Sequence, residues 1–189
     1  MSGRGSVASV LAASVLGATC VAACGESSPP SVADRNFVVS MVPHHHLGMV
    51  LLDDAAPRVA DVRLRRLVFE MSDYHHAETS LLEHRLDEWQ LDGASSFAGE
   101  LSAADLARLD AAEGDDYDVL WLRLMIAHHR GALVLADSQI AHGTVDELVV
   151  MARSVRDVQQ DQIDEMRDLL TELCTESTLG SCDEELDAD

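Results

Sequence analysis

The chain has 189 residues, with 34 Asp and Glu against 13 Arg and Lys, and a formal net charge of −21. Once an N-terminal leader is subtracted, this length suits one domain with one core. Such acidity argues against a surface that binds nucleic acid or anionic lipid, and it attracts cations weakly everywhere rather than at one site.

The first residues are typical of an export signal. Arg4 supplies a positive charge, and an apolar stretch over 7–15 follows it. The small apolar residues before Cys24 resemble a bacterial lipobox, which predicts a signal peptide over 1–23 and a lipid on Cys24. An ordinary signal peptide or a retained anchor helix is the alternative, although the apolar stretch is short for a membrane span. We expect residues 24–33 to be a lipidated tether that holds the protein on the outer face of the membrane, in the cell envelope; without the lipid the protein would be secreted.

The next segment predicts a helical hairpin over 34–92. Asp34 is a suitable N-cap for a first helix that runs to residue 56, in which apolar residues and histidines recur at spacings of three and four. A second amphipathic helix is expected over 61–91, and Gly93 is its expected end. A linker over 93–115 follows, with a short helix of its own.

A second hairpin is expected over 116–174, with Gly143 between its two helices. The tail over 175–189 is acidic and is expected to be loose. An exported protein lies in an oxidising space, so we expect a disulfide between Cys174 and Cys182; two free thiols are the alternative.

The second hairpin repeats the first. Met-Val-Pro-His-His at 41–45 and Met-Ile-Ala-His-His at 125–129 lie 84 positions apart, and the same offset aligns Asp34 with Asp118. Four long helices, two tight turns and a long middle connection predict an all-α four-helix bundle over 34–174. The connection is long enough to cross the bundle, which would give the ferritin-like arrangement; a plain up-down bundle is the alternative.

Each hairpin carries a methionine and two histidines on its first helix. Residues three and four apart share a helix face, so the methionine of each Met-x-x-His-His unit lies one turn from both histidines. Two imidazoles and a thioether can converge on one cation; the thioether favours Cu(I), and imidazole accepts Cu(I), Cu(II) or zinc. The repeat predicts a metal site that prefers copper to zinc. The six candidate ligands are Met41, His44, His45, Met125, His128 and His129.

A structural role for these histidines is the alternative. Adjacent histidines are not expected both to point straight into a core, so one of each pair could cap a packing layer and hydrogen-bond to a neighbouring helix. Met41 and Met125 would then be ordinary core residues, and the protein would be a structural or interaction lipoprotein that binds no metal. His46 and His142 have no counterpart in the other copy and are expected at the surface.

The second helix of the first hairpin adds further candidate metal ligands. His75 and Glu78 share a helix face and could complete a metal site. A solvated polar stripe is the alternative. Their counterparts in the second hairpin are Gln159 and Gln162, so the first half is richer in metal-ligating residues.

An enzymatic di-iron centre is disfavoured, because it needs several inward carboxylates and a Glu-x-x-His motif on two helices. The chain contains no Glu-x-x-His, and it shows no nucleophile elbow, phosphate loop or catalytic triad. An enzyme is therefore not expected, and a metal-dependent redox enzyme is the least favoured class. The sequence indicates no oligomeric state.

The residues from Phe37 to His45, and Met-Ile-Ala-His-His-Arg-Gly-Ala from 125 to 132, resemble the family called domain of unknown function 305. Gln-x-x-Gln-Ile-x-x-Met from 159 to 166 resembles it too, and the resemblance covers residues 34–173. It implies a ferritin-like and often exported protein, similar to periplasmic copper-binding relatives linked to copper tolerance. It makes both Met-x-x-His-His units the best metal candidates.

The chain departs from the pattern of this family at a few positions. The Gln-Gly that usually follows the first histidine pair is replaced by His46-Leu47-Gly48, in which the glycine is displaced, and Arg130 replaces the Gln of the second copy. The Gln-x-x-Glu of the family becomes His-x-x-Glu at 75–78 and Gln-x-x-Gln at 159–162.

Overall fold

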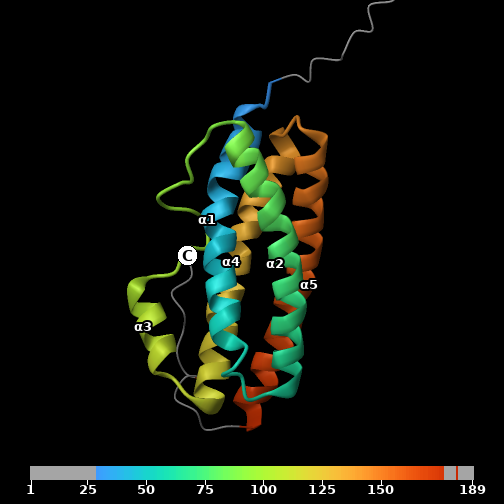
Figure 1. Ribbon diagram of the computed structural model, residues 1–189. Coiled ribbons are helices and arrows are strands. Elements are labelled where there is room, and N and C mark those ends of the chain that lie inside the picture. The colour runs from blue at the N-terminus through green and yellow to red at the C-terminus, as the bar shows by residue number, and fades with distance from the viewer. Residues whose placement is uncertain (1–28, 177–181, 183–189) are drawn as a thin grey trace, which may run out of the picture.

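The computed structural model describes residues 29–176 and Cys182 (Figure 1). Cys24, the predicted signal peptide and most of the acidic tail lie outside the described residues. In the described part of the chain every long element is a helix, as the sequence predicted. The helices are α1 (Val32–Ala55), α2 (Val62–Glu88), α3 (Ala103–Ala111), α4 (Gly114–His142) and α5 (Asp146–Glu176).

Four long helices form the bundle. α1 packs against α2 and α4, whereas α5 packs mainly against α4 and less extensively against α2. In Figure 1 the chain descends α1, ascends α2, returns along the side of the bundle through the linker and α3, ascends α4 and descends α5. The linker therefore crosses the length of the bundle, which confirms the predicted ferritin-like arrangement over the plain up-down alternative.

α1 begins at Val32 rather than at the predicted cap, Asp34. Ser31 is the N-cap, because its hydroxyl accepts a hydrogen bond from the backbone N–H of Asp34 at 3.1 Å. The Asp34 carboxylate in turn accepts from the Ser31 N–H at 2.8 Å, which completes a capping box. The sequence prediction was wrong by one turn, since Ser31 is an equally good cap and Asp34 has a second task.

That second task of Asp34 is to join the two hairpins. Its carboxylate accepts hydrogen bonds from the backbone N–H groups of Thr144 and Val145, in the turn before α5, at 3.0 and 3.2 Å. It also accepts from Gln139 Nε2 at 2.7 Å. Burial alone would raise the pKa of this carboxyl, but the hydrogen bonds from Gln139, Thr144 and Ser31 outweigh it and hold the pKa well below its ordinary value.

Asp118, the counterpart of Asp34, makes the equivalent contact in the other direction. It is fully buried, and its carboxylate accepts from the backbone N–H groups of Ala60 and Asp61, in the turn before α2, at 3.1 and 2.8 Å. Burial raises its pKa, and these backbone hydrogen bonds offset part of the rise. Each hairpin thus contributes one buried carboxylate that caps the turn of the other.

The linker is docked onto α1 where Pro43 interrupts the helical hydrogen bonds. Pro43 has no N–H, so the carbonyl of Val39, one turn earlier, loses its helical partner. The backbone N–H of Ala94 in the linker donates to that carbonyl at 2.9 Å. The proline therefore creates the attachment point for the start of the crossover.

The linker then lies directly against α4. A β-carbon on Gly131 would lie 2.4 Å from the carbonyl oxygen of Ala98, so only glycine permits this close approach. Gly99 has a φ of 80°, in the left-handed region that favours glycine. These two glycines bring the backbone of the linker onto the first helices of both hairpins.

The apolar core is divided into two clusters at opposite ends of the bundle, which we name after Phe37 and Trp121. The Phe37 cluster consists of Phe37, Val38, Met41, Val42, Leu82, Ala132, Ala136, Leu148, Met151, Ala152 and Val155. The Trp121 cluster includes Leu51, Leu52, Leu64, Leu67, Met71, Tyr117, Trp121, Leu122, Met125, Ile163 and Met166. α4 is long and apolar enough to cross a membrane by composition, but 67% of its most apolar stretch is buried inside the bundle.

A disulfide links the end of α5 to Cys182, eight residues further along the chain. Cys174 and Cys182 form a disulfide with their Cα atoms 5.5 Å apart. Arg123 on α4 donates a hydrogen bond from Nη2 to the Cys182 carbonyl at 2.7 Å. The bridge and this hydrogen bond together hold Cys182 against the bundle.

Candidate metal centre

A buried polar layer separates the two apolar clusters. All four long helices contribute to it at the same level of the bundle, and its side chains are at most 8% exposed. Since polar groups are costly to bury, a layer of this kind needs partners within the protein or a bound ligand. The layer consists of His44 and His45 on α1, His75 and Thr79 on α2, His128 and His129 on α4, and Gln159 and Gln162 on α5.

The five histidines of this layer form a closed circuit of rings, which we call the five-imidazole cluster. The rings of His44 and His128 are stacked, with centroids 3.8 Å apart and planes 6° apart. The ring of His75 lies 4.9 Å from that of His45 and 6.0 Å from that of His129. The adjacent rings close the circuit, at 5.9 Å between His44 and His45 and 6.3 Å between His128 and His129.

Both members of each adjacent pair are fully buried, so the expectation that only one could face the interior was wrong. His45 and His129 point toward the second helices of their hairpins, and His44 and His128 point toward the linker. The crossover covers the side of α1 and α4 that a plain hairpin would leave in solvent. The buried arc of each first helix is therefore wide enough for two successive histidines.

Three rings are oriented by backbone carbonyls. Nδ1 of His44 lies 2.9 Å from the Ala98 carbonyl oxygen, and Nδ1 of His128 lies 3.0 Å from that of Gly99. Nδ1 of His75 lies 3.0 Å from the carbonyl oxygen of Met71, one turn earlier on α2. A carbonyl oxygen can only accept, so each Nδ1 carries the proton and each Nε2 carries a lone pair.

The other two rings are oriented by side chains of the second helices. Nε2 of His45 lies 2.9 Å from Glu78 Oε2, and Nε2 of His129 lies 2.9 Å from Gln162 Oε1. These oxygens accept, so here Nε2 carries a proton, and in the neutral ring Nδ1 carries the lone pair. Glu78 is therefore the hydrogen-bond partner of His45, and its side chain is 15% exposed at the edge of the layer.

The five remaining ring nitrogens have no hydrogen-bond partner, although all are buried. They are Nε2 of His44, His75 and His128, and Nδ1 of His45 and His129. Buried polar atoms in native proteins are nearly always satisfied. A set of five lone pairs on one cluster, with no donor facing it, is the arrangement expected of a site for a cation.

Four imidazoles of the cluster, those of His44, His75, His128 and His129, are held in the neutral form that a metal requires. Burial lowers the pKa of His128 to about 3 and that of His129 to about 4. Burial, together with the neighbouring rings, holds the pKa of His44 and His75 well below the ordinary value. Metal binding at neutral pH would therefore release no protons from these four rings.

The donor set fits a soft or borderline metal ion. Imidazole nitrogens suit copper and zinc, and a ligating histidine usually donates its other ring N–H to a carbonyl or carboxylate, which fixes the orientation of the ring. Within residues 29–176 and Cys182, however, no three His, Cys, Asp or Glu side chains are arranged to hold a metal ion as they stand. An ion held by three or more of these imidazoles therefore requires at least one ring to turn about its side-chain torsions.

The two predicted thioether ligands lie on opposite sides of the polar layer. Met41 belongs to the Phe37 cluster and Met125 to the Trp121 cluster, and both side chains are fully buried. Among the other predicted residues, His75 lies inside the cluster. His46 lies at the surface, where it pairs with Glu83 at 2.7 Å, and His142 is also exposed, as expected for both.

Sequence reasoning missed the residues that orient the rings. The carbonyls of Ala98 and Gly99 carry no sequence signal of their own, although the two glycines at 99 and 131 mark the close approach of the linker to α4. Gln162 was identified as the counterpart of Glu78 and as part of the family pattern over 159–166, but not as the partner of His129. Gly48 was noted only as a displaced glycine.

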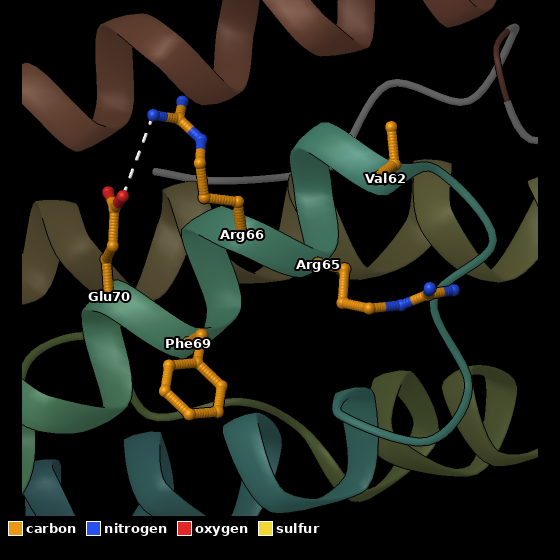
Figure 2. Close-up of a pocket in the computed structure, with 5 residues that line it drawn as sticks. All are labelled: Val62, Arg65, Arg66, Phe69 and Glu70. Atoms are coloured by element: carbon orange, nitrogen blue, oxygen red, sulfur yellow. Dashed lines mark ion pairs between the residues drawn. The ribbon is translucent and has the colours of Figure 1, made fainter.

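A shallow hollow of about 420 Å³ lies elsewhere, on the outer face of α2 near its start (Figure 2). Phe69 and Val62 are exposed there, and Arg66 pairs with Glu70 at 3.6 Å and with Glu165 at 2.6 Å. The charged groups of Arg66 and Glu70 thus neutralise each other beside an apolar surface. The hollow is separate from the buried polar layer.

Together, the fold and the polar layer define a ferritin-like helical bundle with a histidine cluster at its centre. The chain belongs to the family described as domain of unknown function 305 (DUF305), whose profile matches residues 34–170. This membership confirms the resemblance read from the Met-x-x-His-His units. No curated protein matches the chain.

Several solved structures share the fold. A DUF305 protein from Streptomyces coelicolor is 27% identical, with a TM-score of 0.69 over 75% of this chain and 93% of that one. A DUF305 fragment from Deinococcus radiodurans is 22% identical, with a TM-score of 0.69 over 76% and 99%. CopM in its Cu(I)-bound form is 19% identical, with a TM-score of 0.65 over 73% and 95%. CopM has also been solved in Cu(II)-bound, silver-bound and apo forms.

Proposed function

We propose that this protein binds copper in the five-imidazole cluster. The observation that carries the proposal is the set of five buried ring nitrogens that have lone pairs and no hydrogen-bond partner. A purely structural cluster would be expected to pair these nitrogens with donors, since an unmet buried acceptor costs about 1–3 kcal/mol. A cation would satisfy several of them at once.

Copper is favoured over harder cations by the chemistry of the donors. The cluster offers imidazole nitrogens, and the Glu78 carboxylate at the edge of the layer is hydrogen-bonded to His45, which disfavours magnesium and calcium. The thioethers of Met41 and Met125, one on each side of the layer, would add soft donors and a preference for Cu(I) over zinc. The related fold of CopM, a protein solved with Cu(I), Cu(II) and silver, supports the same choice.

We further propose that the protein works in the cell envelope, attached through a lipid on Cys24. The export signal and the lipobox-like triplet before Cys24 support this location. Copper held in a neutral, water-excluded layer would be kept from exposed thiols and from redox reactions with solvent. The proposed role is therefore copper binding that contributes to copper tolerance, without turnover of a substrate.

The proposal is tested by a competition titration of the leaderless protein with a Cu(I) chelator. We expect at least one equivalent of Cu(I) to bind tightly, and the double changes His44→Ala with His45→Ala, or His128→Ala with His129→Ala, each to abolish tight binding. The matched control, His46→Ala with His142→Ala, removes two exposed histidines and should leave the affinity unchanged.

Met41→Leu keeps the volume of the side chain and removes only the soft sulfur. It should weaken Cu(I) more than zinc if the thioether takes part. If the wild type and the quadruple histidine variant hold the same substoichiometric copper, the cluster is a structural polar layer and the proposal is wrong.

A further inference from the structure

The two halves of the polar layer differ at positions that the repeat aligns. His75 on α2 corresponds, at the offset of 84, to Gln159 on α5. Gly48 on α1 corresponds at the same offset to Ala132 on α4. The first half therefore combines an extra imidazole with a missing side chain, and the second half has neither.

The missing side chain of Gly48 lets two imidazoles pack directly against the backbone of α1. A β-carbon built on Gly48 would lie 2.8 Å from His75 Nε2 and 3.0 Å from His128 Nε2. Both nitrogens carry lone pairs, both are buried and neither has a hydrogen-bond partner. The Nε2 atom of His75 on α2 and that of His128 on α4 therefore both lie next to Gly48 on α1.

The aligned position in the second half is an alanine. Ala132 is fully buried, belongs to the Phe37 cluster and carries the methyl group that Gly48 lacks. Gln159, also buried, supplies an amide in place of the imidazole, and its Oε1 has no hydrogen-bond partner. An amide oxygen is a poorer ligand for a soft cation than an imidazole nitrogen.

The hydrogen-bond partners of the rings also favour the first half as a cation site, because one of them is a carboxylate. The ring of His45, 4.9 Å from His75, is hydrogen-bonded to the carboxylate of Glu78. The corresponding ring of His129 is hydrogen-bonded to the neutral amide of Gln162. A carboxylate partner raises the basicity of a ligating imidazole and balances the charge of a bound cation.

We propose that the cluster binds a single copper ion, in the half bounded by Gly48, with Nε2 of His75 and Nε2 of His128 as its first two ligands. Two equivalent ions, one for each Met-x-x-His-His unit, are not expected. This inference rests on the proposed copper binding and adds its stoichiometry, its position and the ligand His75.

The first test is His75→Gln, which makes the two halves alike at this position. In a Cu(I) competition titration we expect one tight equivalent in the wild type and a loss of affinity of about tenfold or more in His75→Gln. Gln159→Ala, the matched change in the other half, should leave the affinity within about twofold of the wild type. Thermal unfolding of both variants verifies that the bundle is intact.

The second test introduces the missing features into the other half. Ala132→Gly combined with Gln159→His should raise the stoichiometry from one Cu(I) to two, because it recreates the imidazole and the glycine that occur together in the first half. Gln159→His alone should not, since Ala132 keeps the methyl group that Gly48 lacks. Gly48→Ala should weaken binding as His75→Gln does.

Ring ¹⁵N shifts supply a readout that does not depend on affinity. Cu(I) is diamagnetic, so one equivalent should shift Nε2 of His75 and His128 while the exposed ring of His46 stays unchanged. Two equal tight equivalents in the wild type, or unchanged binding in His75→Gln, would overturn the inference while leaving copper binding intact. Absence of tight copper in the wild type would instead refute the proposed function.

Discussion

Acid should unfold the copper-free protein well before its carboxylates protonate. Burial lowers the pKa of His44, His75, His128 and His129 below the ordinary value of 6.5. Below pH 6.5 the unfolded chain therefore binds protons that the folded chain does not, and stability is lost as the pH falls. The loss continues until the pH reaches the folded values, about 4 for His129 and about 3 for His128.

The size of this effect follows from the number of groups. One pH unit below the unfolded pKa, each such histidine favours the unfolded chain by about 1.4 kcal/mol. Four of them lower the free energy of unfolding by roughly 6 kcal/mol at about pH 5.5, which is comparable with the whole stability of a typical domain. We therefore expect the copper-free protein to unfold between about pH 4.5 and pH 5.5.

The measurement is urea unfolding of the leaderless protein, followed by far-ultraviolet circular dichroism at a series of pH values in the presence of a copper chelator. His128→Gln with His129→Gln should make the pH dependence shallower, because two of the four groups are gone. His46→Gln with His142→Gln removes exposed rings and should leave it unchanged. A free energy of unfolding that is the same at about pH 7 and pH 5 would refute the reasoning.

Three further predictions concern other parts of the molecule. Asp34→Ala leaves the buried N–H groups of the turn before α5 unpaired and should lower the free energy of unfolding, measured with urea, by about 2–4 kcal/mol. Asp53→Ala removes an exposed carboxylate and should change that free energy by less than about 0.5 kcal/mol. Equal effects of the two changes would contradict the role of Asp34 in joining the hairpins. Cys174 and Cys182 should resist alkylation until a reductant is added, and their bridge should contribute about 2–3 kcal/mol; labelling without reductant would show free thiols. Cys24→Ser should release the protein from the membrane fraction, and mass spectrometry that finds the wild-type Cys24 unmodified would exclude the lipid anchor.

Much of the fold could be predicted because it depends on a repeat. The offset of 84 residues between the Met-x-x-His-His units implies two similar hairpins, and the long segment between them has room to cross the bundle. The same offset aligned Asp34 with Asp118. That each carboxylate caps the turn of the other hairpin depends on how the two hairpins are oriented, and no local sequence pattern contains that information. Asp34 was therefore interpreted as an ordinary helix cap.

The candidate site was predictable only in part, for a similar reason. Helical spacing placed His44 and His45 one turn from Met41, yet the burial of both histidines depends on the linker that covers them. Backbone carbonyls such as that of Gly99 orient the rings, and a backbone carbonyl is the same for every residue type. Pro43 gave a local signal for the docking of the linker, through the Val39 carbonyl that it deprives of a helical partner.

The asymmetry of the cluster is visible in the sequence once the repeat is aligned. Gly48 against Ala132 and His75 against Gln159 are both readable at the same offset. What could not be read is that these positions meet at one point, because that requires α1, α2 and α4 to be placed together. The contact between Gly48 and the two Nε2 atoms is a property of the packed bundle.

Copper K-edge X-ray absorption of the leaderless protein, loaded with one equivalent of Cu(I), tests the central claim most directly. We expect a spectrum dominated by imidazole nitrogen, with multiple scattering from the rings, that is lost in the variant lacking His44, His45, His128 and His129. A copper environment without imidazole scattering, or one unchanged in that variant, would contradict the assignment of the five-imidazole cluster as a copper site.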